Sequence, residues 1–235
     1  MRVLAIGCHP DDLEICCFGT LRKYVEKGAE VYICHVANGD QGHVEIKPEP
    51  LAKIREQEAI RAGKIIGAKE VFNLGVSDMQ VNSHDQAVLD DLADIVRIVR
   101  PDVIITHNDK DYMQDHVETS HLVTNGTFLS GLPHKSQNHP VFKSFVPTFF
   151  MDTLAGVDFN PTHFVDISDQ IDLKLKALSM HESQIKWMLD HDGIDFLDMV
   201  RTCSRYRGYQ CGANYAEGFK PYNVYQRHSP KRLLP

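Results

Sequence analysis

The chain has 235 residues, enough for one substantial hydrophobic core, and its composition is that of a folded globular protein. Its formal net charge of −7 at pH 7 gives no support for a surface that binds nucleic acid or anionic lipid. We therefore expect a single domain over residues 1–235, with no nucleic-acid partner and no insertion into a membrane.

The N-terminus and the cysteines favour a cytoplasmic location. Only a few apolar or small residues precede His9, so no secretory signal is recognised. No stretch approaches the ~18 apolar residues of a membrane-spanning helix. The six cysteines form no CxxC pair, and four of them fall in apolar or helical context, which is typical of reduced buried thiols. A cysteine-based zinc site is not expected.

Strands and helices are predicted to alternate along the first half of the chain. The expected order is a strand at 3–6, a helix over 13–25, a strand at 30–37, a helix at 53–66, a strand at 70–74, a helix at 86–100 and a strand at 102–107. This alternation predicts a parallel sheet with right-handed crossovers. The second half is less regular, with expected strands at 147–152 and 164–167, helices at 173–188 and 196–205, and a surface loop at 131–147.

The predicted fold class is therefore α/β. We expect a Rossmann-like three-layer sandwich whose mostly parallel sheet has the strand order 3-2-1-4-5, followed by an irregular C-terminal part. In this order strands 1 and 4 are neighbours at the switch point of the sheet. The segments that follow them must then face each other across one crevice.

The first of these segments, His-Pro-Asp-Asp at residues 9–12, places one imidazole and two carboxylates between a buried strand and a helix. A dinucleotide site would have a glycine-rich loop here, but the chain has no GxGxxG. Two carboxylates would repel a pyrophosphate and would suit a divalent cation. A second interpretation stays open, in which Asp11 and Asp12 only cap the helix and His9 is an incidental loop residue.

The second segment follows the strand at 102–107 and contains His116, which Asp115 precedes. A neighbouring carboxylate suits a metal-binding imidazole. His116 and His121 are five residues apart, which places them ~140° apart around a helix, so they should not bind one ion together.

His9, Asp12 and His116 form the most economical ligand set, because three ligands leave an open position for water, as in catalytic zinc sites. Two imidazoles and one carboxylate also suit iron(II), so zinc is the expected metal but another divalent ion fits. Asp11 would then be free to act as a general base. The alternative remains that both segments have only structural roles.

Together the two segments resemble the LmbE-like (PIG-L) superfamily of zinc-dependent N-deacetylases. The first family motif, His-Pro-Asp-Asp, matches residues 9–12 without change, and the second, Asp-Tyr-His-Pro-Asp-His, matches residues 111–116 with two differences. The resemblance implies one deacetylase domain, zinc ligation by His9, Asp12 and His116, and Asp11 as the base.

The resemblance assigns further roles. It implies substrate contact by Arg55 and Tyr112 and places Asp115 in the catalytic group. Residues 181–184 and 214–219 resemble motifs of bacillithiol-type deacetylases, so the match covers nearly the whole chain. The implied reaction is removal of an N-acetyl group from an N-acetylglucosamine-type sugar or glycoconjugate, with a metal-bound water attacking the amide. Relatives are often oligomers, so analogy alone suggests a homo-oligomer, and the sequence itself does not give the oligomeric state.

Met113 is the main difference from the family, whose members often have a catalytic histidine at this position. Methionine cannot donate a proton, and loss of a positioned acid lowers the rate by roughly 10²–10⁴-fold. Asp11, Tyr112, His107 or His43 are candidate replacements. The alternatives are a non-catalytic or impaired metal- or sugar-binding relative and a hydrolase of another amide, whereas the acidic cluster disfavours phosphoesters.

Overall fold

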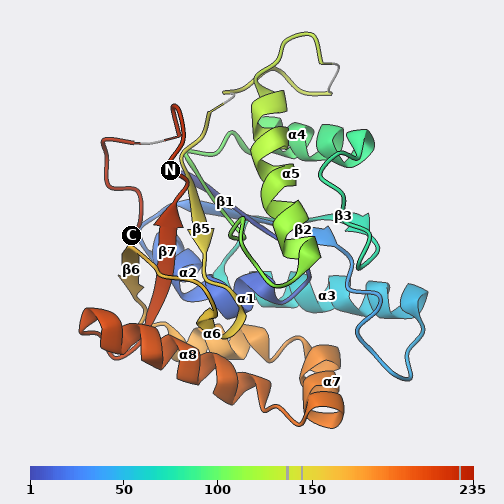
Figure 1. Ribbon diagram of the computed structural model, residues 1–235, viewed down its shortest axis with the longest axis vertical. Coiled ribbons are helices and arrows are strands. Elements are labelled where there is room, and N and C mark those ends of the chain that lie inside the picture. Colours follow the sequence, from blue (N-terminus) through green and yellow to red (C-terminus); the bar gives the residue numbers. More distant parts are fainter. Residues whose placement is uncertain (136–137, 144, 228) are drawn as a thin grey trace.

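The computed structural model describes residues 1–135, 138–143, 145–227 and 229–235. Seven strands form one sheet in this part of the chain (Figure 1). They are β1 (Arg2–Gly7), β2 (Glu30–Ala37), β3 (Glu70–Val76), β4 (Val103–Thr106), β5 (Thr148–Met151), β6 (His163–Asp166) and β7 (Ala216–Pro221). The helices are α1 (Asp12–Cys16), α2 (Phe18–Glu26), α3 (Pro48–Ile66), α4 (Gln86–Val99), α5 (Gln114–Ser130), α6 (Ile171–Leu178), α7 (Glu182–Asp192), α8 (Phe196–Cys211) and a 3-10 turn, η1 (Leu154–Gly156).

The strand order of the sheet is β3-β2-β1-β4-β5-β7-β6. The first five strands of this order are parallel, and β7 pairs antiparallel with both β5 and β6. The predicted order 3-2-1-4-5 is confirmed, and the antiparallel pair extends it. β1 and β4 are neighbours in register, with Ile6 opposite Thr106, so the chain leaves both strands at the same edge of the sheet.

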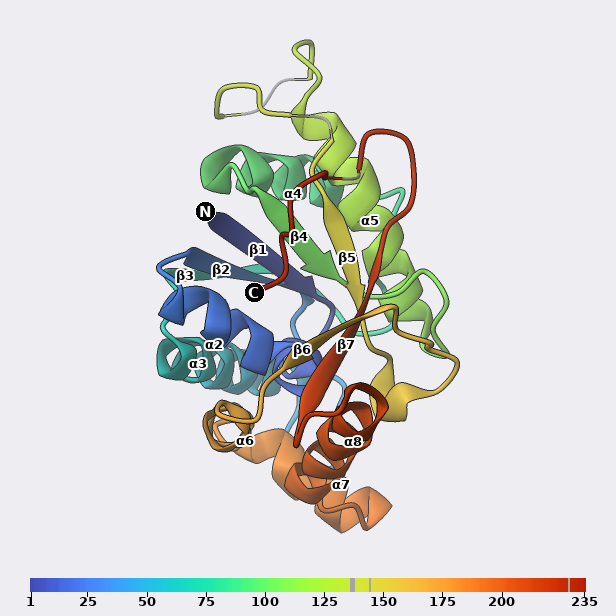
Figure 2. The same cartoon turned by 90° about the vertical axis from the view of Figure 1, so that its left-hand side faces the viewer.

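Helices cover both faces of the sheet, as a three-layer sandwich requires. Figure 2 shows α2 and α3 on one face and α4 and α5 on the other. Along β1, Val3 and Ala5 pack into the core on the first face, whereas Leu4 and Ile6 pack into the core on the second. Because both faces are buried, the strand is a continuous apolar run, which explains why its sequence was recognisable.

The prediction of a single helix over residues 13–25 is wrong. The segment forms two helices, α1 and α2, with a break at Cys17. The carboxylate of Glu217 on β7 accepts the N–H groups of Gly19 and Thr20 at 2.9 and 2.7 Å. These are donors of the first turn of α2, so a distant side chain caps a new helix start.

The C-terminal half is more regular than expected. The helix predicted at 173–188 is two helices, α6 and α7, and the break ends at His181, whose Nε2 lies 2.8 Å from Glu14 Oε1. Strand β7 was not predicted, since Gly218 and Pro221 are typical of loops. Helix α3 begins at Pro48, earlier than predicted, with a proline in its first turn. Of the loop predicted at 131–147, residues 136, 137 and 144 lie outside the described residues.

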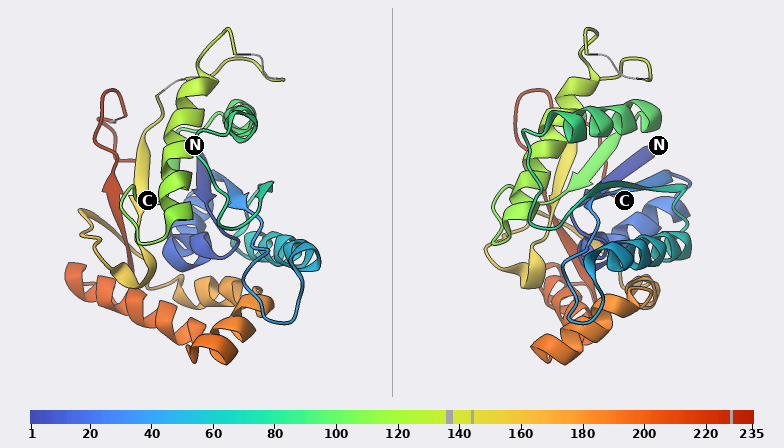
Figure 3. Two further views of the ribbon diagram at one scale, coloured as in Figure 1. Left: turned by 45° about the vertical axis from the view of Figure 1, so that its right-hand side comes forward. Right: turned by 90° about the vertical axis from the view of Figure 1, so that its right-hand side faces the viewer.

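Helix α7 and the loop at 38–47 lie side by side at the edge of the sheet where β1, β2 and β4 end (Figure 3). Gln184 of α7 donates a hydrogen bond to the carbonyl of Gly42 in that loop at 3.1 Å. These segments therefore enclose the crevice beyond the strand ends. No helix in the described part of the chain is long and apolar enough to cross a membrane.

Candidate active site

The predicted ligands come together at the end of β1 and the first turn of α5. Asp12 lies between two imidazoles, with its Oδ1 3.3 Å from His116 Nε2 and its Oδ2 3.4 Å from His9 Nδ1. Asp12 Oδ2 also accepts a hydrogen bond from the backbone N–H of His9 at 2.6 Å. This bond fixes the carboxylate at the turn between β1 and α1. The strand order therefore brings His9 and His116, which are more than a hundred positions apart in the sequence, within 3.4 Å of the carboxylate of Asp12.

Asp12 is held as an anion. Burial acts to raise its pKa, but the imidazoles of His116 and His107 outweigh burial and keep the pKa of Asp12 well below its usual range. Burial similarly acts to lower the pKa of His116, and the carboxylate of Asp12 overcomes this and raises it to about 10. The site thus stabilises positive charge beside Asp12, as a cation site must.

His116 has the orientation of a metal-ligating imidazole. Its Nδ1 lies 3.2 Å from Asp111 Oδ2, while its buried Nε2 makes no hydrogen bond among the described residues. Metal-bound histidines keep their second nitrogen on a carboxylate or carbonyl in this way. A buried nitrogen that makes no hydrogen bond and lies 3.3 Å from an ionised carboxylate fits a site where both atoms would bind one metal ion.

His9 is held by a different carboxylate. Its Nε2 lies 3.4 Å from Asp115 Oδ2 and 3.9 Å from Asp78 Oδ1. The other ring nitrogen, Nδ1, points toward Asp12. Asp115 also accepts the N–H of Met79 at 2.6 Å. The expectation that Asp115 supports His116 is therefore wrong, because Asp111 holds that histidine. Sequence reasoning assigned no role to Asp111, although it is the first residue of the second motif.

Among the described residues, two groups of side chains have ligand atoms close enough to share an ion: Cys8, His9 and Asp12, and Asp12, His107 and His116. Neither group contains both His9 and His116, whose ring centroids lie 5.4 Å apart, so Asp12 is the member common to both. His107 is less suited than the predicted ligands, because its Nε2 accepts the N–H of Cys8 at 2.9 Å. Burial lowers the pKa of His107 to about 4, so it is a neutral ring that stacks on His116 at 4.0 Å. Burial raises the pKa of the Cys8 thiol, which makes the thiolate scarce.

Asp11 faces the same space from a strained backbone. Its φ of 131° is rare for a residue with a Cβ and costs about 1–3 kcal/mol. Its Oδ2 lies 3.1 Å from Arg55 Nη2. Burial raises the pKa of Asp11 to about 6, against the opposing effect of Arg55. The carboxyl group can therefore exchange a proton near neutral pH.

Arg55, a predicted substrate contact, is occupied mainly within the protein. The side chain is only 3% exposed, and its guanidinium donates to the carbonyls of Pro10 and Gly39 besides pairing with Asp11. It still lines the pocket. Tyr112, the other predicted contact, is 65% exposed at the rim, and its ring meets that of His116 edge-on at 6.4 Å.

The residues of the 181–184 motif support the site from α7. Ser183 donates to Glu58 through both its N–H and its hydroxyl, at 2.9 and 2.6 Å, which ties α7 to α3. Gln184 lines the pocket beside Gly42. No role was predicted for Gln184 from the sequence, and its place in the motif was the available signal.

The site opens into a pocket of about 500 Å³, a volume typical of small-molecule sites. Its lining includes His9, Asp11, Asp12, His116 and Met113, together with the apolar side chains of Trp187, Met188, Ile194 and Phe196.

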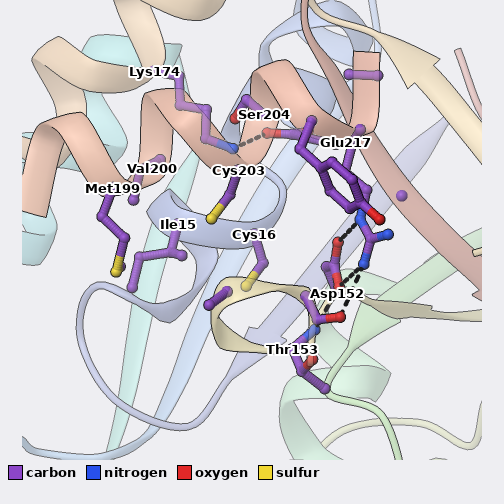
Figure 4. Close-up of a pocket in the computed structure, with 16 residues that line it drawn as sticks. Ile15, Cys16, Asp152, Thr153, Lys174, Met199, Val200, Cys203, Ser204 and Glu217 are labelled. Atoms are coloured by element: carbon purple, nitrogen blue, oxygen red, sulfur yellow. Dashed lines mark hydrogen bonds and ion pairs between the residues drawn. The ribbon is translucent and has the colours of Figure 1, made fainter. Parts of the chain in front are cut away.

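A second, smaller cavity of about 30 Å³ lies beside the pocket and shares Ile15, Cys16 and Asp152 with it. It has room for about one water molecule. Figure 4 shows the contact of Lys174 with Glu217 that closes one side, with a separation of 2.6 Å. The part of the 214–219 motif that contains Glu217 therefore has a structural role.

Comparison with known sequences gives a match over residues 4–126 to the family model described as PIG-L, GlcNAc-PI de-N-acetylase. Diacetylchitobiose deacetylase from Thermococcus kodakarensis is 27% identical over 239 residues, covering 93% of this chain and 82% of that protein. A probable N-acetyl-alpha-D-glucosaminyl L-malate deacetylase 2 from Bacillus cereus is 29% identical over 197 residues, covering 80% of this chain and 86% of that protein.

Solved structures agree with the predicted fold class. N,N'-diacetylchitobiose deacetylase from Pyrococcus horikoshii, in complex with the inhibitor MPG, has a TM-score of 0.80 at 27% identity, with 94% of this chain and 83% of that chain covered. GalB, the 4-carboxy-2-hydroxymuconate hydratase from Pseudomonas putida, has a TM-score of 0.82 at 21% identity over 99% of both chains. The latter likeness concerns the fold alone.

Proposed function

Because the chain belongs to the PIG-L (GlcNAc-PI de-N-acetylase) family, we propose that it is a metal-dependent hydrolase that removes the N-acetyl group from an N-acetylglucosamine-type sugar or glycoconjugate. One observation carries the proposal: the buried Nε2 of His116, which makes no hydrogen bond among the described residues, lies 3.3 Å from the ionised carboxylate of Asp12, and both residues line a pocket of about 500 Å³. The relatives described above, which are named as sugar deacetylases, support the same reaction class.

His9, Asp12 and His116 would hold the ion, and zinc is the metal we propose, with iron(II) as the alternative. When bound, a divalent ion lowers the pKa of water and polarises a carbonyl group. The two histidines are pre-oriented for this task because each keeps one nitrogen toward a carboxylate, Asp115 for His9 and Asp111 for His116. In this assignment Asp115 positions a ligand rather than acting on the substrate.

Asp11 is the proposed general base. Its carboxyl group is buried at the pocket, and its raised pKa gives it a basicity suited to taking a proton from water. Arg55 holds the carboxyl group in place at 3.1 Å. Tyr112 is the proposed proton donor in place of a histidine at position 113. Burial raises the pKa of the Tyr112 phenol, so its hydroxyl keeps its proton at neutral pH.

Acetate release from N,N'-diacetylchitobiose tests the proposal, measured on chelated and zinc-reloaded protein together with the metal content. We expect His116→Ala to lose both metal and activity, because it removes a ligand. Asp11→Asn should keep the metal and lose most turnover. His121→Ala, an exposed histidine on the same helix, is the matched control. Full activity of the chelated protein, or an unaltered kcat in Asp11→Asn, would contradict the assignment.

Met113 favours a second candidate function, a sugar-binding relative with an impaired site. The side chain lines the pocket where a general acid would stand, and it cannot transfer a proton. Met113→His separates the two candidates. A large rise in acetate release would indicate an impaired site in the natural chain, whereas an unchanged rate would support another donor such as Tyr112.

A further inference from the structure

A separate cavity of about 490 Å³ lies between the sheet and the C-terminal segment that follows β7. We call it the tail cavity, and residues 147–149, 163–164, 221, 227, 229 and 231–234 line it. Because β5 is parallel to β4 and β1, the start of β5 in this lining lies at the edge of the sheet opposite the candidate active site. Figure 2 shows the segment after β7 turning back to end beside α2, where the Tyr24 hydroxyl donates to the Leu233 carbonyl at 2.9 Å.

The charged side chains that line the tail cavity are all basic. Its described lining residues contain no aspartate or glutamate, and they include Arg227, Lys231, Arg232 and His163. None of these four side chains forms an ion pair with a carboxylate in the described part of the chain. The cavity therefore collects uncompensated positive charge, although the formal net charge of the chain is −7.

Arg227 differs from the other buried arginines in having few partners. The described residues that are arginines at most 6% exposed are Arg55, Arg97, Arg207 and Arg227. Arg55 and Arg207 each contact an aspartate, and Arg97 donates to three carbonyl groups. Arg227 donates from Nη2 to the Thr124 carbonyl at 3.0 Å, while its buried Nη1 makes no hydrogen bond among the described residues. A buried guanidinium without a carboxylate lacks the anion that normally compensates its charge.

The backbone before Arg227 turns this charge into the protein. Gln226 has a φ of 57°, in the left-handed region that residues other than glycine seldom adopt. The N–H of Arg227 donates to the Val224 carbonyl at 3.2 Å and closes the turn. Burial lowers the pKa of Arg227 below the usual arginine value, so the protein by itself stabilises the charge incompletely.

We propose that the tail cavity binds a small organic anion whose carboxylate or phosphate group pairs with Arg227. A guanidinium donates paired hydrogen bonds to the oxygens of both groups, and a modest rotation brings two donors to the cavity because only one hydrogen bond holds it. The exposed Lys231 and Arg232 add positive charge, and apolar side chains such as Phe149 and Leu233 contact the body of the ligand. A volume of about 490 Å³ is typical of small-molecule sites.

The first test is calorimetric titration of the zinc-loaded chain with phenyl phosphate, benzoate and benzyl alcohol, which share one ring and differ in charge. We expect the better of the two anions to bind at least roughly tenfold more tightly than the alcohol, with a gap that narrows in high salt. Arg227→Gln should weaken binding of that anion roughly 10- to 100-fold and leave the alcohol unaffected. Arg205→Gln, the same change at an arginine of α8 outside the cavity, is the matched control. Equal anion binding by the natural chain and Arg227→Gln would overturn the proposal.

The same titration on chelated protein separates the tail cavity from the proposed metal centre, with which it shares no described lining residue. Anion binding should persist after zinc removal and in His116→Ala. Binding that disappears with zinc and survives in Arg227→Gln would place the anion at the candidate active site instead. These measurements need no catalytic activity, so they do not depend on the proposed deacetylase function.

Thermal unfolding distinguishes a ligand-binding arginine from a structural one. Without ligand, Arg227→Met should keep or raise the Tm, because it removes an uncompensated buried charge and retains most of the apolar stem. Arg97→Met should lower the Tm, since it leaves three carbonyl groups without their donor. Phenyl phosphate or benzoate at about 100 times its Kd should raise the Tm of the natural chain by roughly 5–10 °C and leave Arg227→Met unchanged. A ligand-free loss in Arg227→Met as large as in Arg97→Met would assign Arg227 to the fold alone and overturn the site.

Discussion

At the scale of single residues, the candidate centre consists of a central anion and two oriented imidazoles. Asp12 is shared between His9 and His116, and each histidine has a separate carboxylate on its other nitrogen. This division matters because a carboxylate partner fixes the orientation of the imidazole and increases its basicity as a ligand. Asp111 and Asp115 are therefore positioning residues in our assignment.

Substitution of either positioning carboxylate should weaken zinc binding. We expect Asp115→Asn and Asp111→Asn to raise the zinc Kd by roughly 10- to 100-fold, since an amide orients the histidine less well. Competition with a chromophoric chelator gives the Kd without any activity measurement. Asp109→Asn, at an exposed aspartate of the same segment, is the control. A Kd unchanged in both variants would show that these carboxylates do not support the ligands.

At the scale of secondary-structure elements, buried charged pairs decide where helices break. Lys174 and Glu217 are each at most 2% exposed, and Glu217 also caps α2. Removing one member of such a pair leaves the other as an uncompensated buried charge. The break between α6 and α7 is linked in the same way to the buried contact of His181 with Glu14.

Glu217→Gln should therefore destabilise the fold by about 3–5 kcal/mol, measured as the free energy of urea unfolding. The double variant with Lys174→Met should recover part of the loss, because no unpaired buried charge remains. Asp190→Asn breaks an exposed pair with Lys186 and serves as the control, with little expected change. A loss in Glu217→Gln no larger than in the control would contradict the structural role of this pair.

His181 predicts a pH dependence of stability. Burial lowers its pKa, but the carboxylate of Glu14 outweighs burial and raises it above the usual value. A group with a raised pKa in the folded state stabilises the protein fully below its unfolded pKa of about 6.5 and loses this effect as the pH rises through the folded value. Urea unfolding should show a decline in stability above about pH 6.5 that is reduced in His181→Gln and retained in His121→Gln.

At the scale of the whole molecule, the sheet and the C-terminal helices contribute different parts of the candidate site. The parallel strands β1 and β4 bring the proposed ligand segments together, and α7 with the start of α8 contributes further residues to the lining of the pocket. The proposed metal ligands and the apolar lining residues of the pocket therefore come from parts of the chain that are far apart in sequence.

Zinc should stabilise the whole fold, because its ligands come together only when β1 and β4 pair. Zinc at about 1,000 times its Kd contributes about 4 kcal/mol, which corresponds to a rise in Tm of roughly 8–16 °C for a chain of this size. Differential scanning fluorimetry measures the shift. In His116→Ala the rise should be largely lost, and an equal rise in both proteins would place the metal elsewhere.

The sequence by itself determined the order of the first five strands, because apolar runs buried on both faces and stop signals such as Pro101 are local features. It also brought His9, Asp12 and His116 to one crevice, since the order places β1 beside β4.

Only the tertiary structure decided which carboxylate supports which histidine, where α1 gives way to α2, and that Trp187 faces the pocket. Glu217 caps a helix whose first donors lie 198 residues earlier in the chain. Hydrophobic periodicity describes how one segment buries its own face, but the partner of a polar side chain depends on segments that meet only after folding. Those partners determine the chemistry that the candidate centre can perform.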